Sequence, residues 1–508
     1  MRYVIGIDIG TSGTKTALFD EQGRKVASKT VEYPLYQPHE GWAEQEPRDW
    51  WCATVEGIRA VTADIDKTEI AGVGLSGQMH GLVMLDGEGE VLRRSIIWCD
   101  QRTAHQCDEI TERVGAVRLM EITKSPALTG FTASKILWVR EHEPEIYEKC
   151  RTILLPKDYI RYMLTGERAT EVSDASGMQL LDIARRDWSG EVLDALGIDR
   201  GLLGKVYESH EVTGRINAAA SEATGLPVGI PVVGGAGDNA ASAVGCGVVS
   251  GGRAFTTIGT SGVVFAHSPS LAADPQGRMH SFCAAVPGEW HVMGVIQSAG
   301  LSLRWFRDNF CGTEQAEAKR RGVDVYKVMD EVAASSAVGS GKLLFLPYLM
   351  GERTPHLDPN ARGAFIGLTS THTRGDMLRA VMEGVTFALR DSLELFSAAG
   401  ITVGDMMACG GGASSPLWRQ MLSDVFGCRV RTAASNEGGA LGAAILAAVG
   451  AGIYADVREA CGAVIGEGTV CEPDTERSRR YAELYAIYRR LYGHLKDEYA
   501  AMSRLSLD

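Results

Sequence analysis

Hydrophobic and polar positions change their spacing along the start of the chain. Short apolar runs at Val4–Asp8, Lys15–Phe19 and Lys25–Tyr33 are separated by glycine-containing turns, a pattern typical of β-strands. Over Pro47–Val61 the apolar residues follow helical spacing instead. A three-stranded meander followed by a helix is therefore predicted.

The rest of the first half alternates between strand-like and helical stretches. Three further strands are expected at Ala71–Leu75, Gly81–Leu85 and Ser95–Trp98. The pattern over 104–186 is mainly helical, and a buried strand beginning at Pro231 ends in a tight turn that carries Asp238. Ligands of open α/β sheets collect beyond strand ends, so the loop at 77–81 is a candidate site.

The second half begins in the same way, with a strand, a turn at Ile258–Gly262 and another strand. The segment Thr373–Asp376 has the spacing of a capping box, and the apolar residues after it predict a helix with one buried face. A strand ending at Cys409 leads through three glycines into a helix near Pro416, a turn that suits close approach of a nucleotide. Arg477–Arg504 is predicted to be a terminal packing helix.

The turns that open the two halves carry the same pentapeptide. Ile-Gly-Thr-Ser-Gly occurs at Ile9–Gly13 and again at Ile258–Gly262, almost half the chain apart. Glycine-rich turns expose backbone N–H groups that can converge on an anion such as phosphate. Only the first copy follows an acidic strand residue, Asp8. This difference predicts that both turns bind one polyphosphate, while a metal ion is held mainly from the side of the first turn.

Size and composition limit the possible functions. A chain of 508 residues exceeds the usual size of one core, which favours two domains of similar size, in agreement with the repeat. The formal net charge is −13 without a long basic run, which argues against nucleic acid or an anionic membrane as the main partner. The eleven cysteines are scattered without a Cys-x-x-Cys pair, so free thiols are expected rather than a disulfide framework or a zinc site. No signal peptide or membrane span is recognised, and we expect a soluble cytoplasmic protein.

Five motifs in this order resemble the FGGY carbohydrate kinases and, within them, the xylulokinases. They are Asp8-Ile-Gly-Thr-Ser-Gly-Thr-Lys15, Gly77-Gln-Met-His-Gly81, Gly237-Asp-Asn239, Gly259-Thr-Ser-Gly262 and Gly410-Gly-Gly412. Two longer stretches, Gly130–His142 and Gly363–Leu368 running on to Met382–Gly384, are similar to signatures of the same family. The resemblance covers nearly the whole chain.

The resemblance implies an α/β fold of two ribonuclease-H-like domains of the actin/Hsp70/sugar-kinase type. The domains are expected at 1–249, for sugar binding and Mg²⁺ positioning, and at 250–508, for nucleotide binding. ATP and sugar would occupy the cleft between them. The implied activity is ATP-dependent phosphorylation of D-xylulose at O5, with Mg²⁺, a ketopentose and ATP as ligands and a homodimer as one permitted assembly.

Each chemical requirement of phosphoryl transfer then has a candidate residue. Asp238 is the expected general base and Asp8 the expected Mg²⁺ ligand, while Met79, His80 and Asn239 are expected with Asp238 at the sugar. The nucleotide would contact the repeated turns and a glycine-rich pocket, at Thr11, Ser12, Gly13, Thr260, Ser261, Gly300, Gly411, Gly412 and Ser415.

Simpler interpretations stay open for several of these residues. Asp238 could be a turn residue that bonds its own backbone, and the Met-His pair could be core packing. Lys15 could reach a phosphate or point into water, and Asp100 and Arg102 could support the site or be purely structural. For the whole chain the alternatives are a kinase for ribulose, L-xylulose or a sugar acid such as gluconate, an actin- or Hsp70-like ATPase, or a non-catalytic sugar sensor.

Overall fold

The computed structural model describes residues 2–433 and 437–505. The first half of the chain builds a mixed sheet in the order β13-β14-β5-β1-β2-β3, with β15 also paired to β5. Its strands are β1 (Tyr3–Ile9), β2 (Gly13–Asp20), β3 (Lys25–Glu32), β5 (Ile70–Gly77), β13 (Val212–Arg215), β14 (Pro231–Val233) and β15 (Ala236–Gly237). The meander β1-β2-β3 is antiparallel and β5 pairs parallel to β1, as the apolar spacing predicts.

The second half builds a sheet in the order β18-β19-β17-β16-β22-β23-β24. Its strands are β16 (Arg253–Ile258), β17 (Gly262–Ser268), β18 (His280–Cys283), β19 (Trp290–Ile296), β22 (Asp405–Cys409), β23 (Arg429–Ala433) and β24 (Glu467–Cys471). Strands β16, β17 and β19 form an antiparallel meander, and β22 pairs parallel to β16. The run β3-β2-β1-β5-β14 thus has its counterpart in β19-β17-β16-β22-β23, and the repeated pentapeptide occupies the same hairpin turn in both sheets.

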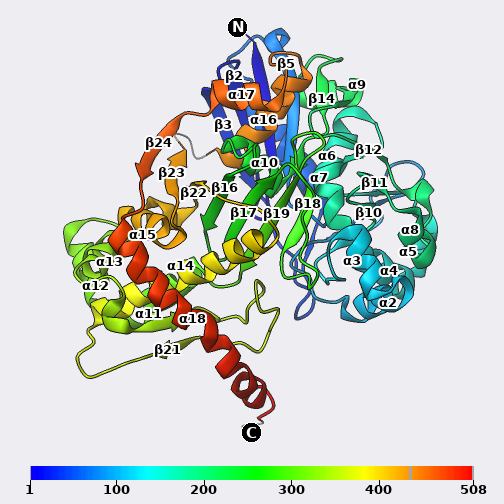
Figure 1. Cartoon of the computed structure of the whole chain (residues 1–508). Helices are drawn as coiled ribbons and strands as arrows, with labels where there is room; N and C mark the ends of the chain where they lie inside the picture. Colours follow the sequence, from blue (N-terminus) through cyan, green and yellow to red (C-terminus); the bar gives the residue numbers. More distant parts are fainter. Residues whose placement is uncertain (1, 434–436, 506–508) are drawn as a thin grey trace.

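Two helices lie between the sheets, α10 (Asp238–Gly245) and α16 (Gly438–Gly450), as Figure 1 shows. Helix α16 contacts α10, β1 and β5. The backbones approach so closely that a Cβ on Gly442 would overlap the carbonyl oxygen of Ala241, and one on Gly6 would overlap that of Ala440. We call the first sheet with α10 and α16 the first lobe, and the second sheet with its helices the second lobe.

A largely helical layer is inserted into the first lobe and forms the cyan side of the molecule in Figure 1. Its helices are α2 (Ala104–Val114), α3 (Ala116–Thr123), α4 (Thr132–His142), α5 (Pro144–Lys149), α7 (Val172–Ala175) and α8 (Gly190–Leu196). Helices α1 (Pro47–Val61), α6 (Pro156–Thr165) and α9 (Ala218–Thr224) pack on one another, and α1 and α6 also contact the first sheet. Short strands accompany them, namely β4 (Glu44–Gln45), β6 (Val83–Leu85), β7 (Ser95–Ile96), β8 (Thr152–Leu154), β9 (Ala169–Glu171), β10 (Leu181–Asp182), β11 (Asp187–Trp188) and β12 (Lys205–Tyr207). The stretch 104–186 is therefore mainly helical, as predicted, but it also contains β8, β9 and β10, which are too short for periodicity to reveal.

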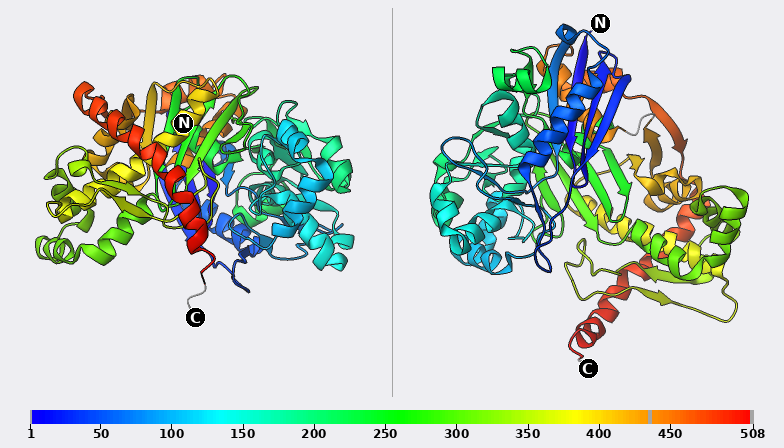
Figure 2. Two further views of the ribbon diagram at one scale, coloured as in Figure 1. Left: turned by 60° about the horizontal axis from the view of Figure 1, so that its bottom comes forward. Right: turned by 180° about the vertical axis from the view of Figure 1, so that it is seen from behind.

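The second lobe is covered by helices that Figure 2 shows from two further sides. They are α11 (Gly300–Phe310), α12 (Gly312–Arg321), α13 (Val325–Ala334), α14 (Arg374–Ala398), α15 (Pro416–Phe426) and α18 (Thr475–Met502), with the hairpin β20 (Leu344–Leu346) and β21 (Ala364–Ile366). The predicted capping box is present at the start of α14, where Thr373 and Asp376 bond each other's backbone N–H groups. The terminal helix α18 buries Tyr481, Tyr485 and Tyr488, as expected of a packing helix.

The predicted division of the chain at 249/250 stays a prediction. Helix α16, and α17 (Val457–Val464) that packs on it, come late in the sequence yet contact elements of the first lobe. Within residues 2–433 and 437–505, no helix combines the length and apolar character needed to cross a membrane.

Candidate active site

Two cavities border the turn between β16 and β17. One has a volume of about 260 Å³ and is lined from the first lobe by Met79, His80, Asp238 and Asn239, and from the second lobe by residues that include Ser261. The other has a volume of about 720 Å³ and is lined by residues that include Thr260. Since Thr260 and Ser261 are consecutive, one turn borders both cavities. We call them the small cavity and the large cavity.

Asp238 is the first residue of α10 and faces the small cavity. Its Oδ1 accepts hydrogen bonds from the backbone N–H of Asn239, at 2.7 Å, and from the Asn239 side chain, at 3.0 Å. Burial, together with the negative charge of Asp8, raises the pKa of Asp238 to about 6. Such a carboxylate is ionised at neutral pH and remains basic enough to accept a proton.

Asp8 comes from β1, on the side of the first sheet that α16 covers. Ser76 donates a hydrogen bond of 2.8 Å to its Oδ1, and burial raises the pKa of Asp8. Its Oδ2 lies against Gly439, where an added Cβ would come within 2.8 Å of that oxygen, so the backbone of α16 packs closely on Asp8 and the position requires glycine. Two neighbouring carboxylates with raised pKa values fit a Mg²⁺ ion that keeps most of its water ligands. No cluster of three or more His, Cys, Asp or Glu side chains suited to a metal is found in the described part of the chain, and an ion held in this way needs none.

His80 is fixed in the small cavity by its neighbours. Its backbone has a positive φ of 69°, and its carbonyl oxygen accepts a hydrogen bond of 2.8 Å from the buried Lys135. The ring stacks on Phe131 at 4.5 Å, and its Nδ1 lies 2.8 Å from the carbonyl oxygen of Gly177. Burial lowers the pKa of His80 to about 3, so the imidazole is neutral. When the proton is on Nδ1, the ring donates a hydrogen bond to the carbonyl oxygen of Gly177, and Nε2 is left as a hydrogen-bond acceptor.

The turn Gly259–Gly262 is held by the start of α11. The backbone N–H of Gly300 donates to the carbonyl oxygen of Gly259 at 2.7 Å, and the N–H groups of Ala299 and Leu301 both donate to that of Thr260 at 3.1 Å. A Cβ on Gly300 would overlap the Gly259 carbonyl oxygen, so this position requires glycine. The turn is therefore fixed before any ligand binds.

The matching turn of the first lobe has different neighbours. Thr11 accepts a hydrogen bond of 2.9 Å from the indole of Trp98, which lines the small cavity, and its carbonyl oxygen accepts one of 2.6 Å from Gln45. Ser12 and Gly13 continue the hairpin into β2, and neither they nor Thr11 line the two cavities. Their phosphate-binding role stays a prediction.

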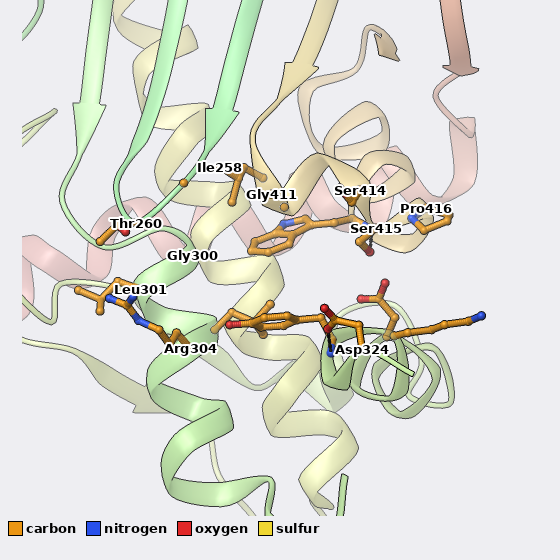
Figure 3. Close-up of a pocket in the computed structure, with 17 residues that line it drawn as sticks. Ile258, Thr260, Gly300, Leu301, Arg304, Asp324, Gly411, Ser414, Ser415 and Pro416 are labelled. Carbon is orange, nitrogen blue, oxygen red and sulfur yellow. Dashed lines mark hydrogen bonds between the residues drawn. The ribbon is translucent and has the colours of Figure 1, made fainter. Parts of the chain in front are cut away.

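The large cavity lies between the glycine-rich turn after β22 and the helices α11 and α13, as Figure 3 shows. Gly411, Gly412 and Ser415 line it with Gly300, so this predicted group is brought together. Ser415 is also the N-cap of α15, since its hydroxyl accepts the N–H of Trp418 at 3.0 Å. The wall of the large cavity that the glycine-rich turn forms consists largely of backbone and apolar groups.

Three other sequence candidates, Lys15, Asp100 and Arg102, make contacts within the protein. Lys15 forms an ion pair of 2.6 Å with Glu437. Asp100 is fully buried and binds Arg102, whose guanidinium lies 3.6 Å from the centre of the Trp42 ring. None of these three residues lines either cavity, and their roles stay predictions.

Comparison with known proteins identifies the family. The model of the N-terminal domain of the FGGY family of carbohydrate kinases matches residues 3–245, and that of its C-terminal domain matches 254–451. This chain belongs to the FGGY carbohydrate kinases. A xylulose kinase of Bacillus subtilis (strain 168) is 40% identical over 499 residues, which cover 98% of both chains. The solved xylulose kinase of Rhodospirillum rubrum has a TM-score of 0.91 at 30% identity, covering 98% of this chain and 100% of that one. A gluconokinase of Bacillus subtilis (strain 168) is 32% identical over 507 residues, 99% of this chain and 98% of its own.

Membership of the FGGY family makes the chain a sugar kinase with ATP as co-substrate, rather than an assembly or chaperone ATPase. Several lining residues of this FGGY kinase were missed by sequence reasoning. Arg353 and His280 line the small cavity from the second lobe, and Arg304, Asp324 and Tyr326 line the large one. None lies in a glycine turn or next to a repeated motif, so the sequence carries no local signal for them.

Proposed function

We propose that this FGGY kinase transfers the γ-phosphoryl group of ATP to O5 of D-xylulose. The observation that carries the proposal is the single turn bordering both cavities, with Thr260 on the large cavity and Ser261 beside Asp238 on the small one. A nucleotide in the large cavity would direct its terminal phosphate along this turn. The substrate follows from the 40% identity to the Bacillus subtilis xylulose kinase.

Asp238 is the proposed general base. Its carboxylate would accept the hydroxyl proton as O5 attacks the phosphorus, because it faces the small cavity and is ionised at neutral pH. Hydroxyl and N–H groups of Thr260 and Ser261 would donate to the phosphoryl oxygens as charge develops on them. Asp8 would hold Mg²⁺ through water molecules, and the ion would neutralise phosphate charge when bound.

The rest of the small cavity would recognise the sugar. Nε2 of His80 would accept a hydrogen bond from one sugar hydroxyl, while Asn239 and Arg353 supply donors from the two lobes. Met79, held against Gly237, and Phe131 provide apolar walls. A site with donors from both lobes requires both to be in place around the sugar, which excludes water from the reacting phosphate.

Gluconate is the second candidate substrate. Arg353 lines the small cavity and could pair with a carboxylate, and a gluconokinase is among the relatives. Gluconate carries a negative charge and D-xylulose does not, so the cavity should bind the two with different affinities.

The deciding test is ADP release against a panel of D-xylulose, L-xylulose, ribulose and gluconate, with the sugar-free rate subtracted. We expect kcat/KM for D-xylulose to exceed that for every other compound by at least about tenfold. A higher value for gluconate would replace the proposed substrate, and ADP release independent of sugar would overturn the proposal.

The rate should depend on the ionisation of Asp238. Because the base acts as carboxylate and its pKa is about 6, kcat/KM should be level at neutral pH and fall about tenfold per pH unit below pH 6. The measurement is the pH profile of sugar-dependent ADP release. In Asp8→Asn the neighbouring charge is lost, so the midpoint of the remaining activity should move to lower pH. An unmoved midpoint would mean that a different group titrates.

Replacement of His80 tests sugar recognition. His80→Ala removes the proposed acceptor and should raise KM for the sugar by about tenfold, with the dissociation constant of ATP unchanged. Steady-state kinetics and calorimetry measure the two quantities. The matched control is His105→Ala, an exposed histidine of α2, which should change neither. Weakened ATP binding in the His80 variant would assign the residue to the nucleotide instead.

A further inference from the structure

Two thiols from different lobes touch each other, one at the end of α10 and one at the end of β22. The Sγ atoms of Cys246 and Cys409 lie 3.5 Å apart, and both cysteines are free. They are 163 positions apart in the sequence, so the contact depends on how the lobes meet. A disulfide requires an S–S distance of about 2.0 Å, so the sulfurs would have to approach by roughly 1.5 Å.

Each thiol ends an element that leads into one of the cavities. Cys246 is the C-cap of α10, the helix whose first residue is Asp238. Cys409 is the last residue of β22, and the chain passes from it through Gly410, with a positive φ of 80°, to Gly411 on the large cavity. A bond between the two sulfurs would therefore join the helix of the proposed base to the nucleotide turn.

The two thiols differ in accessibility and reactivity. Cys246 is 4% exposed, whereas Cys409 is partly exposed. The Cys246 thiol hydrogen-bonds to Cys409, which lowers the pKa of Cys409 and raises that of Cys246. The thiolate is the nucleophile in thiol chemistry, so Cys409 is suited to react first with a reagent from solvent and Cys246 to react second.

We infer that Cys246 and Cys409 form a redox-active pair whose oxidation to a disulfide ties the two lobes together and slows turnover. The oxidant is a low-molecular-weight disulfide. The Cys409 thiolate attacks one of its sulfurs, forms a mixed disulfide and releases one small thiolate. Cys246 then loses its proton and attacks the Cys409 sulfur, releasing the second small thiolate. The protein loses two electrons and two protons, and the oxidant becomes two small thiols.

The expected consequence is a loss of rate. Sugar kinases of two lobes bring substrate and nucleotide together by movement of the lobes, and a bond between α10 and β22 would restrict this movement. Drawing the sulfurs together also displaces the start of the glycine turn at Gly410. The effect should fall on kcat, and reduction should reverse it.

The test uses the whole protein with glutathione disulfide as the probe. After treatment and removal of the reagent, peptide mass spectrometry without reduction should find the Cys246 and Cys409 peptides joined, with the loss of two hydrogens. The kcat with the most active sugar of the panel should fall about tenfold and return on addition of dithiothreitol. The peptide readout does not depend on which sugar is the substrate, so it is independent of the proposed function.

Three single variants make the result specific. Cys246→Ser should retain one glutathione on Cys409 and form no joined peptide, whereas Cys409→Ser should keep its kcat after oxidation and acquire no glutathione at Cys246. The matched control is Cys461→Ser, which removes a third buried thiol that donates to the carbonyl oxygen of Val244 near the pair, and it should still be inactivated. The inference is overturned if the joined peptide does not form, if it forms while kcat is unchanged, or if the Cys461 variant alone becomes resistant.

Discussion

Asp238→Asn should lower kcat for sugar phosphorylation by about 10³-fold or more while the affinity for ATP stays within about twofold. The amide has the shape of the carboxylate, and its oxygen can still accept the hydrogen bonds from Asn239, so α10 should begin as before. Only the capacity to accept the hydroxyl proton is lost. ADP release and calorimetric titration with ATP measure the two effects.

Asp66→Asn is a matched control for this substitution. Asp66 also accepts a backbone N–H, that of Thr68 at the start of a short 3₁₀ helix, but it is exposed and lines neither cavity. The kcat of the Asp66→Asn variant should equal that of the wild-type protein. If Asp238→Asn retains more than about a tenth of the wild-type kcat, Asp238 is not the base, because loss of a general base costs at least about 10²-fold.

Gly442→Val should lower the free energy of unfolding by about 3 kcal/mol or more. The glycine lies where α16 crosses α10, and a Cβ there would overlap the backbone carbonyl of Ala241, which cannot rotate away as a side chain would. The helices would have to separate, and α16 would lose its contact with the first sheet. The urea midpoint, followed by circular dichroism, measures the effect.

The comparison variant is Gly462→Ala in α17, where nothing lies within 4 Å of the added Cβ. Alanine should stabilise this helix by about 0.5–1 kcal/mol, since glycine loses more backbone freedom on folding. A similar midpoint for Gly442→Val and the wild-type protein would mean that α10 and α16 do not depend on this close approach.

Local sequence signals predicted the elements that are stabilised locally. Helix α1 occupies Pro47–Val61 as expected, and the capping box at Thr373 marks the start of α14, because both depend on residues within one or two helical turns. Asp238 was expected at a strand tip, and it follows β15 directly as the first residue of α10.

Local sequence signals did not predict the cavity residues whose position depends on contacts between segments far apart in the sequence. His280 reaches the small cavity because β18 pairs with β19. Arg353 reaches it from a loop that is bonded to β19, where the N–H of Thr354 donates to the carbonyl oxygen of Val295. The identical pentapeptides predicted equivalent roles for Thr11 and Thr260. Their surroundings differ, since Thr11 bonds Trp98 whereas Thr260 borders the large cavity. A motif specifies a backbone shape, and the lobe around it determines what that shape contacts.

Because Thr260 and Ser261 are neighbours in a turn that the start of α11 already fixes, the spacing between the two cavities is set by the fold. Neither reactant has to order this turn on arrival, so binding loses no conformational entropy there. The covalent connection between the two residues thus keeps the reactants in register and raises their effective concentration toward each other.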